Sequence, residues 1–277
     1  MPLSDDDQTC LDFRLTVAPP ARVHAYDLPT GRVHYFDTRV PHSELSIRAE
    51  SLVVTHRQNP FLFLPAANEN GEFYRRESVR QDYAEYLTAT ERVQLYPETD
   101  RIAAISRKQA SGAGVVPFLM ALTRQLYRVL SYAPGSTNVN TPILDVLENR
   151  AGVCQDFAHL MLAICRRQSI PARYVSGYLY TGEDRRTHPQ SGGGGGSEDG
   201  VPHGLVSGNA MHAWVECLLP DNRWHGFDPT NNLLTNDYYV KVHTGRDYGD
   251  VPPVRGVYRG PFAHTLEVDV RVTSDPV

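Results

Sequence analysis

"RAGVCQDFAHLMLAICRR", residues 150–167, decides the fold, because it joins a glycine, a cysteine and an apolar helical run. Phe157, Leu160 and Ile164 recur at the spacing of a helix face that packs on a core. Cys154 falls in the first turn of this helix, beside unpaired backbone N–H groups and the positive end of the helix dipole. Both features favour thiolate over thiol, so Cys154 is either a reactive group or a small buried hydrophobe.

The chain around this helix passes from strands to helices and back to strands. Residues 10–56 alternate apolar and polar positions and are rich in β-branched and aromatic residues, which predicts strands. Residues 115–129 follow the 3.6-residue period of a helix. Residues 169–181 predict a strand, residues 209–232 a hairpin around Pro-Asp-Asn, and the tail 254–277 ends in strand alternation.

This order predicts an α+β fold with two lobes, which we divide into residues 1–105 and residues 106–277. Within the second lobe, residues 182–208 are polar, Gly-rich and low in complexity, so we expect a flexible loop there. In "NTPILDVLENRAG" we expect Thr141 as the N-cap of a helix, a proline at its first position and Gly152 as its stop.

Composition excludes several classes of function. The 277 residues are 41% hydrophobic and 21% charged with a net charge of −5, which gives no electrostatic basis for binding nucleic acid or an anionic membrane. The four cysteines are few and irregularly spaced, and no His/Cys cluster has metal-ligand spacing. We therefore expect free thiols, a cytoplasmic location, no metal and no cofactor.

A reactive cysteine needs a base, and the base needs an orienting partner. The hairpin that follows the flexible loop offers His212 in "MHAWVE" and Asp228 in "WHGFDPT". An odd hairpin loop, as Pro-Asp-Asn would give, puts both side chains on one face as opposite or diagonal neighbours. An even loop would point them to opposite faces, so the parity of the loop is a test.

Each of these residues also has an ordinary structural explanation. A lone cysteine at an apolar helix start is usually buried and inert, a histidine beside a tryptophan is often a core residue, and "DPT" is a common turn. Two further residues are candidates for a substrate cleft. Gln155 follows Cys154 but is turned off its face, so we expect a helix-start hydrogen bonder, with an oxyanion role as the lesser alternative. Trp214 shares the face of His212 and either walls the site or fills the core.

Three blocks in this order resemble the bacterial branch of the transglutaminase-like superfamily, one of the papain-like cysteine folds. They are "GVCQDFAHLMLAICRRQSIPARYVSGYL" (152–179), "HAWVECLLPDNRWHGFDPTNN" (212–232) and "GRDYGDVPPVRGVYRG" (245–260). The resemblance covers roughly residues 110–270. It implies a catalytic domain in which a nucleophile helix packs on an antiparallel sheet.

The resemblance implies a nucleophile at Cys154, a general base and acid at His212 and an orienting carboxylate at Asp228. The implied chemistry is acyl transfer through a thioester on peptides or proteins. We favour hydrolysis, as a protease or amidase, over amine transfer to glutamine, because no second site for an amine is visible. A non-catalytic binding module and a redox-sensing thiol remain as alternatives, and the substrate and oligomeric state stay open.

The segment upstream also resembles the β-sandwich region that precedes this domain in many bacterial members. "CLDFRLTVAPPARVHAYDLPTGRVHYF", residues 10–36, looks like the middle of that region, and the strands that usually come first are not found. We therefore expect a small, apparently truncated β-sandwich ahead of the catalytic domain.

Overall fold

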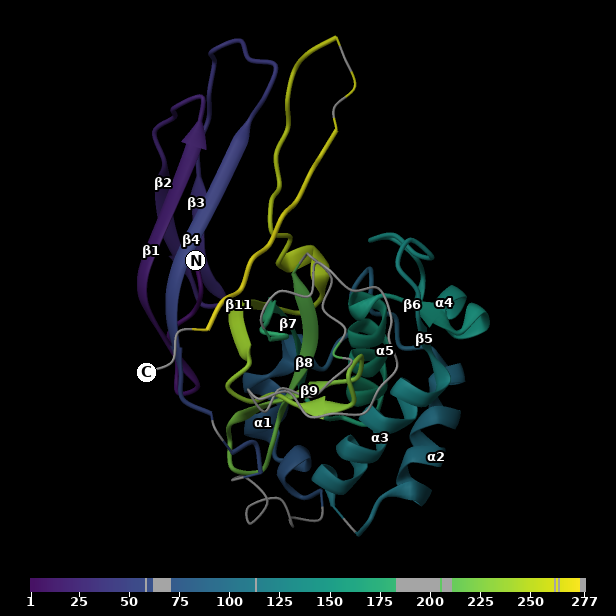
Figure 1. Ribbon diagram of the computed structural model, residues 1–277. Coiled ribbons are helices and arrows are strands. Elements are labelled where there is room, and N and C mark those ends of the chain that lie inside the picture. The colour runs from purple at the N-terminus through teal and green to yellow at the C-terminus, as the bar shows by residue number, and fades with distance from the viewer. Residues whose placement is uncertain are drawn as a thin grey trace.

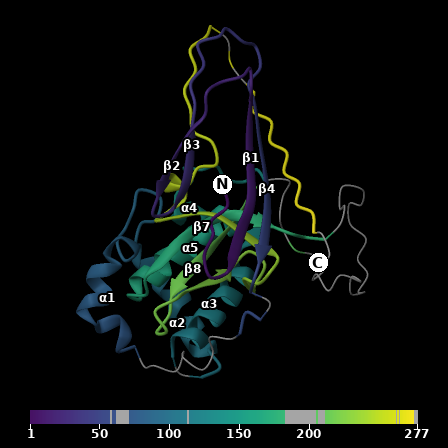
Figure 2. The same ribbon diagram turned by 90° about the vertical axis from the view of Figure 1, so that its left-hand side faces the viewer.

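The computed structural model describes most of the chain and is shown in Figure 1. The described residues are 1–57, 59–61, 71–112, 114–182, 205, 211–261, 263 and 265–274. Helices and a five-stranded sheet form the core. An elongated N-terminal lobe of strands lies on the opposite side of the molecule from α2 and α3 (Figures 1 and 2). The α+β class is thus confirmed. No helix in the described ranges combines the length and apolar character that crossing a membrane would need.

The N-terminal lobe consists of two antiparallel pairs of strands. β1 (Gln8–Ala18) pairs with β4 (Ser46–Thr55), and β2 (His24–Leu28) pairs with β3 (Gly31–Tyr35) across a Pro-Thr turn. The rings of Phe13 and His34 lie 4.8 Å apart, so the two pairs face each other through side chains. The predicted small sandwich therefore exists as two two-stranded sheets.

The central sheet has the strand order β10-β9-β8-β7-β11, and its neighbouring strands are antiparallel. Its strands are β7 (Ala172–Leu179), β8 (His212–Leu218), β9 (Trp224–Asp228), β10 (Leu233–Leu234) and β11 (Tyr239–Gly245). The expected hairpin is β8–β9. Leu219 and Arg223 close a three-residue loop through a 3.0 Å hydrogen bond from Leu219 N–H to Arg223 C=O, so the odd loop is confirmed.

Helices cover the sheet and complete the core. They are α1 (Glu77–Asp82), α2 (Asp100–Gln109), α3 (Val115–Val129), α4 (Ile143–Asn149) and α5 (Cys154–Arg167). The helix quoted first, α5, packs on β7 and β8, and its residues Gln155–Arg166 are all buried. The apolar periods that predicted α3 and α5 therefore correspond to faces that pack on one shared core with β8.

Three local expectations need correction. The helix after Thr141 begins at Ile143 with Pro142 as its N-cap, and it ends before Arg150, which adopts the left-handed conformation (φ 51°). Thr141 instead accepts a hydrogen bond from Asn138 N–H at 2.9 Å. Gly152 lies beyond the helix in a short strand, β6 (Ala151–Gly152).

The strand expected in the C-terminal tail is also wrong for the residues that the structure describes. Between residues 252 and 274 none of them belongs to a strand, and Val257 and Leu266 are 100% and 78% exposed. An alternating pattern provides an apolar face that could pack on a core. A strand forms only when a neighbouring strand also pairs with its backbone N–H and C=O groups. This segment runs out toward the far end of the N-terminal strands and turns back (Figures 1 and 2).

Two further expectations concern the organisation of the chain. α2 was not anticipated, and the boundary expected between residues 105 and 106 falls inside it. The division of the chain into two domains stays a prediction. The Gly-rich loop, residues 182–208, lies outside the described residues except for Gly182 and Leu205.

Candidate active site

Cys154 is the first residue of α5 and follows an extended residue, Val153 (φ −108°, ψ 178°). Asp156 secures this helix start, because its Oδ2 accepts hydrogen bonds from the Val153 N–H at 2.7 Å and from the Thr137 hydroxyl at 2.6 Å. Burial raises the pKa of Asp156 despite these two bonds. Gly152 is required here, since a Cβ would lie 2.7 Å from Asp156 Oδ2. The half-buried Cys154 is thereby held at the N-terminus of α5.

His212 opens β8 and lies opposite Gly177 on β7. Its ring is buried, and the rings of Trp214 and Tyr239 each lie 6.2 Å from it. Gly177 is needed at this crossing, because a Cβ would lie 2.5 Å from the indole of Trp214. The imidazole is therefore fixed by packing as well as by its hydrogen bonds.

The hairpin brings Asp228 to His212. The ladder pairs Val215 with Phe227, so the same register puts Asp228 opposite Trp214 and diagonal to His212. His212 Nε2 lies 2.7 Å from Asp228 Oδ2, and both side chains are at most 1% exposed. The contact leaves Nδ1 as the ring nitrogen available to another partner.

Asp228 accepts hydrogen bonds at both carboxylate oxygens. Its Oδ2 receives the Tyr239 hydroxyl at 2.8 Å and Asn231 Nδ2 at 2.7 Å in addition to His212. Its Oδ1 receives the backbone N–H groups of Thr230 and Asn231 at 2.9 and 3.2 Å. Burial raises the pKa of Asp228, but the charge of His212 and the hydrogen bonds from His212, Asn231 and Tyr239 lower it more. The carboxylate is thus kept ionised.

The thiol of Cys154 completes the group. Burial lowers the pKa of His212, but the charge and hydrogen bond of Asp228, together with the neighbouring Cys154 side chain, raise it to about 10. The balance favours a protonated imidazolium between two acceptors, a sulfur and a carboxylate. Such a group can shuttle a proton to and from the sulfur.

The structure therefore joins His212 directly to Asp228, and Cys154 lies near enough to the imidazole to contribute to the raised pKa of His212. The two cleft candidates are less open than expected. Gln155 is 9% exposed, and Trp214 is 2% exposed and packs with Val175, Leu179 and Tyr239. Trp214 thus both fills the core and backs the imidazole, while a role of Gln155 or Trp214 toward substrate stays a prediction.

Sequence reasoning missed three residues around the site. Asn231 could have been suspected, because an amide three residues after an aspartate in a turn often bonds back to it. Tyr239 lies on β11, which is not a neighbour of the hairpin strand β9, and no sequence signal pointed to it. Tyr132 lies on β5 (Ser131–Tyr132), which pairs with β6 just before Cys154; burial and the neighbouring Cys154 raise the pKa of Tyr132.

Within the described part of the chain, no group of three or more His, Cys, Asp or Glu side chains is arranged to hold a metal ion. The chemistry that these residues themselves can perform is that of a thiol, an imidazole and a carboxylate in series.

Comparison with known proteins places these features in a family. Residues 104–229 match the family description "Transglutaminase-like superfamily", and residues 1–54 match "Bacterial transglutaminase-like N-terminal region". An uncharacterized protein of Mycobacterium leprae is 34% identical over 273 residues, which are 98% of this chain and 89% of the relative. An uncharacterized protein of Mycobacterium tuberculosis is 32% identical over 282 residues, covering 96% of this chain and 82% of the relative.

A solved structure from Cytophaga hutchinsonii, described as a "Putative Cysteine Protease", is similar over 91% of this chain and 76% of its own. The sequence identity is 25% and the TM-score is 0.62. Both family regions match in the order that the sequence blocks predicted, and the fold agrees. The chain belongs to the transglutaminase-like superfamily.

Proposed function

We propose that this protein is a thiol enzyme that transfers acyl groups from amide or isopeptide bonds of peptides or proteins, with hydrolysis as the favoured reaction. In this proposal Cys154 is the nucleophile, His212 the general base and acid, and Asp228 the carboxylate that orients the imidazole. The observation that carries it is the buried 2.7 Å contact between His212 Nε2 and Asp228 Oδ2, with Cys154 near enough to the same imidazole to raise its pKa. The similarity to the Cytophaga hutchinsonii protein, whose description names a cysteine protease, supports hydrolysis.

In the first half-reaction, the imidazole of His212 holds the proton that the thiol of Cys154 has given up, and the sulfur attacks the carbonyl carbon of the amide. Backbone N–H groups at the start of α5 are donors for the oxyanion that develops on the carbonyl oxygen. The C–N bond then breaks, the amine leaves with the proton from His212, and a thioester joins the acyl group to Cys154.

In the second half-reaction, His212 takes a proton from water, and the water oxygen attacks the thioester carbonyl. The C–S bond breaks, the sulfur recovers the proton from His212, and a carboxylic acid is released. Throughout, the ionised Asp228 stabilises the imidazolium, in agreement with the raised pKa of His212. A primary amine in place of water forms a new amide from the same thioester, so the two reactions differ only in the second nucleophile.

The test is incubation with a glutamine-containing peptide and a labelled primary amine, followed by intact-mass measurement. The masses separate peptide cleavage, deamidation, amine incorporation and absence of reaction. Cys154→Ala is the control and should abolish the product. Deamidation or cleavage supports hydrolysis, and incorporation of the amine would replace hydrolysis by transfer.

A second measurement does not depend on the choice of peptide. Iodoacetamide should alkylate Cys154 far faster than Cys10, which is also half-buried, because a thiolate is the reacting species. Peptide mapping by mass spectrometry gives both rates in one sample. Equal rates at the two cysteines, together with no product from the peptide, would refute the proposed function.

A further inference from the structure

We propose that Tyr239 is a positioning residue of this site, which holds the carboxylate of Asp228 so that His212 is aligned with Cys154. The inference rests on the proposed function and extends it to a residue outside the series of three. Tyr239 acts through its hydrogen bond to the carboxylate.

The contact of Tyr239 with Asp228 crosses the sheet. In the order β10-β9-β8-β7-β11, two strands separate the strand of Tyr239 from that of Asp228. The tyrosine side chain nevertheless reaches over the sheet face, and its hydroxyl donates to Asp228 Oδ2 at 2.8 Å. Its ring packs edge-on against Trp214 at 5.3 Å and lies 6.2 Å from His212. Core packing alone would be satisfied by a phenylalanine, so the hydroxyl has a role of its own.

The hydroxyl fixes the rotation of the carboxylate. Oδ1 of Asp228 is held by backbone N–H groups of its own turn, so that end cannot move independently of the chain. Oδ2, which meets His212, is held by side chains, because Tyr239 and Asn231 approach it together with the imidazole. Tyr239 is 5% exposed, and burial and Asp228 raise its pKa well above the ordinary value, so its hydroxyl stays a donor.

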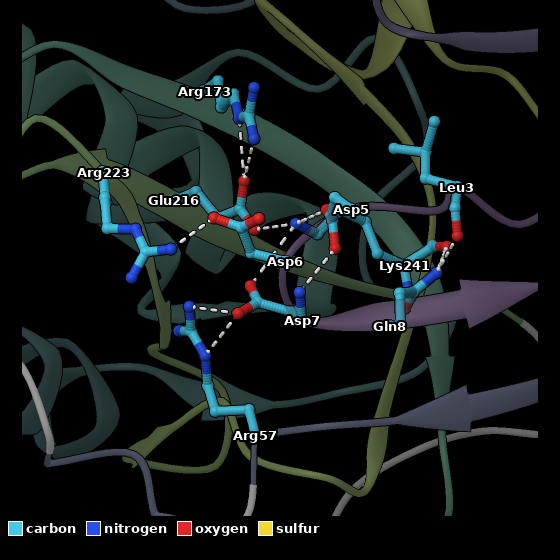
Figure 3. A network of polar contacts seen from close by, with 10 residues as sticks. All are labelled: Leu3, Asp5, Asp6, Asp7, Gln8, Arg57, Arg173, Glu216, Arg223 and Lys241. Carbon is cyan, nitrogen blue, oxygen red and sulfur yellow. Dashed lines mark hydrogen bonds and ion pairs between the residues drawn. The ribbon is translucent and has the colours of Figure 1, made fainter.

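The position of Tyr239 is in turn fixed by the N-terminal residues, which hold β11 two residues further on. Lys241 N–H donates to Gln8 Oε1 at 2.7 Å, and Lys241 C=O accepts from Gln8 Nε2 at 2.7 Å and from Leu3 N–H at 3.2 Å. The ammonium of Lys241 lies 2.6 Å from Asp5 and 2.7 Å from Glu216 (Figure 3). Because the backbone and side chain of Lys241 are both bound, the register of β11 is held, and the hydroxyl of Tyr239 stays within hydrogen-bond distance of Asp228.

The test compares Tyr239→Phe with Tyr74→Phe. Tyr74 is a matched control, because it is 8% exposed and its hydroxyl donates a 2.9 Å hydrogen bond to the backbone C=O of Leu218, at the other end of β8 from His212. Each variant keeps its ring and loses one buried hydrogen bond, so similar losses of stability are expected. The two readouts are the iodoacetamide rate at Cys154 at pH 6 and, for a peptide that is turned over, kcat and KM separately.

Tyr239→Phe should lower the alkylation rate and kcat by about tenfold, the scale of one hydrogen bond to a charged group, and leave KM unchanged. Tyr74→Phe should leave all three at the values of the unaltered protein. Suppose that Cys154 of the unaltered protein is alkylated faster than Cys10, but that its rate in Tyr239→Phe equals or exceeds its rate in Tyr74→Phe. This result overturns the inference and leaves the proposed function standing. If Cys154 of the unaltered protein reacts no faster than Cys10 and no product forms from the peptide, both this inference and the proposed function are overturned.

Discussion

Replacement of Glu216 by glutamine tests the buried charge network that joins the N-terminal residues to the central sheet (Figure 3). The Glu216 side chain is 3% exposed, and its carboxylate lies 2.6 Å from Arg173 and 2.7 Å from Lys241. Burial raises the pKa of Glu216, but the charges and hydrogen bonds of Lys241 and Arg173 lower it from 4.5 to about 2. At about 1.4 kcal/mol per pH unit, this difference corresponds to about 3 kcal/mol of folding free energy at neutral pH.

The same magnitude follows from the general cost of about 3–5 kcal/mol for removing one partner of a buried ion pair. Lys241 and Arg173 would stay buried beside a neutral amide. Glu216→Gln should therefore lower the free energy of unfolding at pH 7 by about 3 kcal/mol, a large part of the ~5–15 kcal/mol that domains have. Urea unfolding followed by circular dichroism measures it.

The pH dependence supplies the sharper criterion. The folded pKa of Glu216 is below its unfolded value, so its contribution is complete above about pH 4.5 and is lost as the pH falls toward 2. The difference between the unaltered protein and Glu216→Gln should be constant from pH 8 to 5 and shrink to about 1.4 kcal/mol at pH 3. Glu50→Gln is the control, because Glu50 forms an exposed pair with Arg48. A loss under about 1 kcal/mol at pH 7, or a loss equal to that of Glu50→Gln, would refute the reasoning.

Three further outcomes follow from buried groups. Burial lowers the pKa of His159 from 6.5 to about 4, so the free energy of unfolding should fall by about 3 kcal/mol between pH 6.5 and pH 4, as the unfolded state takes up a proton that the buried ring does not. His159→Gln should remove this fall, as measured by urea unfolding at several pH values, and an unchanged dependence of the unfolding free energy on pH would contradict it. Gly177→Ala places a Cβ against the backbone oxygen of Val240 and 2.5 Å from the Trp214 ring, and it should cost about 1–3 kcal/mol, which an unaltered melting temperature would disprove. Cys165 and Cys217 are fully buried, with their sulfurs 3.8 Å apart, so a thiol reagent should leave both unmodified in the native protein and label them in denaturant; rapid native labelling would speak against this packing.

The parts of the fold that sequence reasoning predicted are those set by local periodicity. α5 follows from one apolar face, and the β8–β9 hairpin from two strands and a loop whose odd length sets which side chains share a face. The hairpin parity predicted that His212 and Asp228 share a face, whereas the expectation that Cys154 meets them came from the resemblance to the family. Both the helix and the hairpin can be predicted because helix periodicity and hairpin parity depend on residues that are close together in the sequence.

The parts that could not be predicted depend on contacts distant in sequence. Tyr239 reaches Asp228 only because β11 occupies the far edge of the sheet, a property of strand order that alternation does not encode. The tail has the alternating pattern of a strand but no pairing strand among the described residues, so the prediction of a strand from the pattern alone was wrong. Gly152 was assigned to a helix end, whereas the close approach of Asp156 is what excludes a side chain there.

The buried ion pairs of Glu216 with Arg173 and Lys241 are structurally coupled to the candidate site, because both involve the strands β8 and β11. On β8, His212 and Glu216 are four residues apart and therefore on one face, and on β11, Tyr239 and Lys241 are two apart and share a face likewise. The Glu216–Lys241 contact therefore ties together the same pair of strands whose other ends meet at Asp228 through His212 and Tyr239. A change in the N-terminal residues that grip Lys241 can reach the imidazole through strand register, without any contact between those residues and the sulfur.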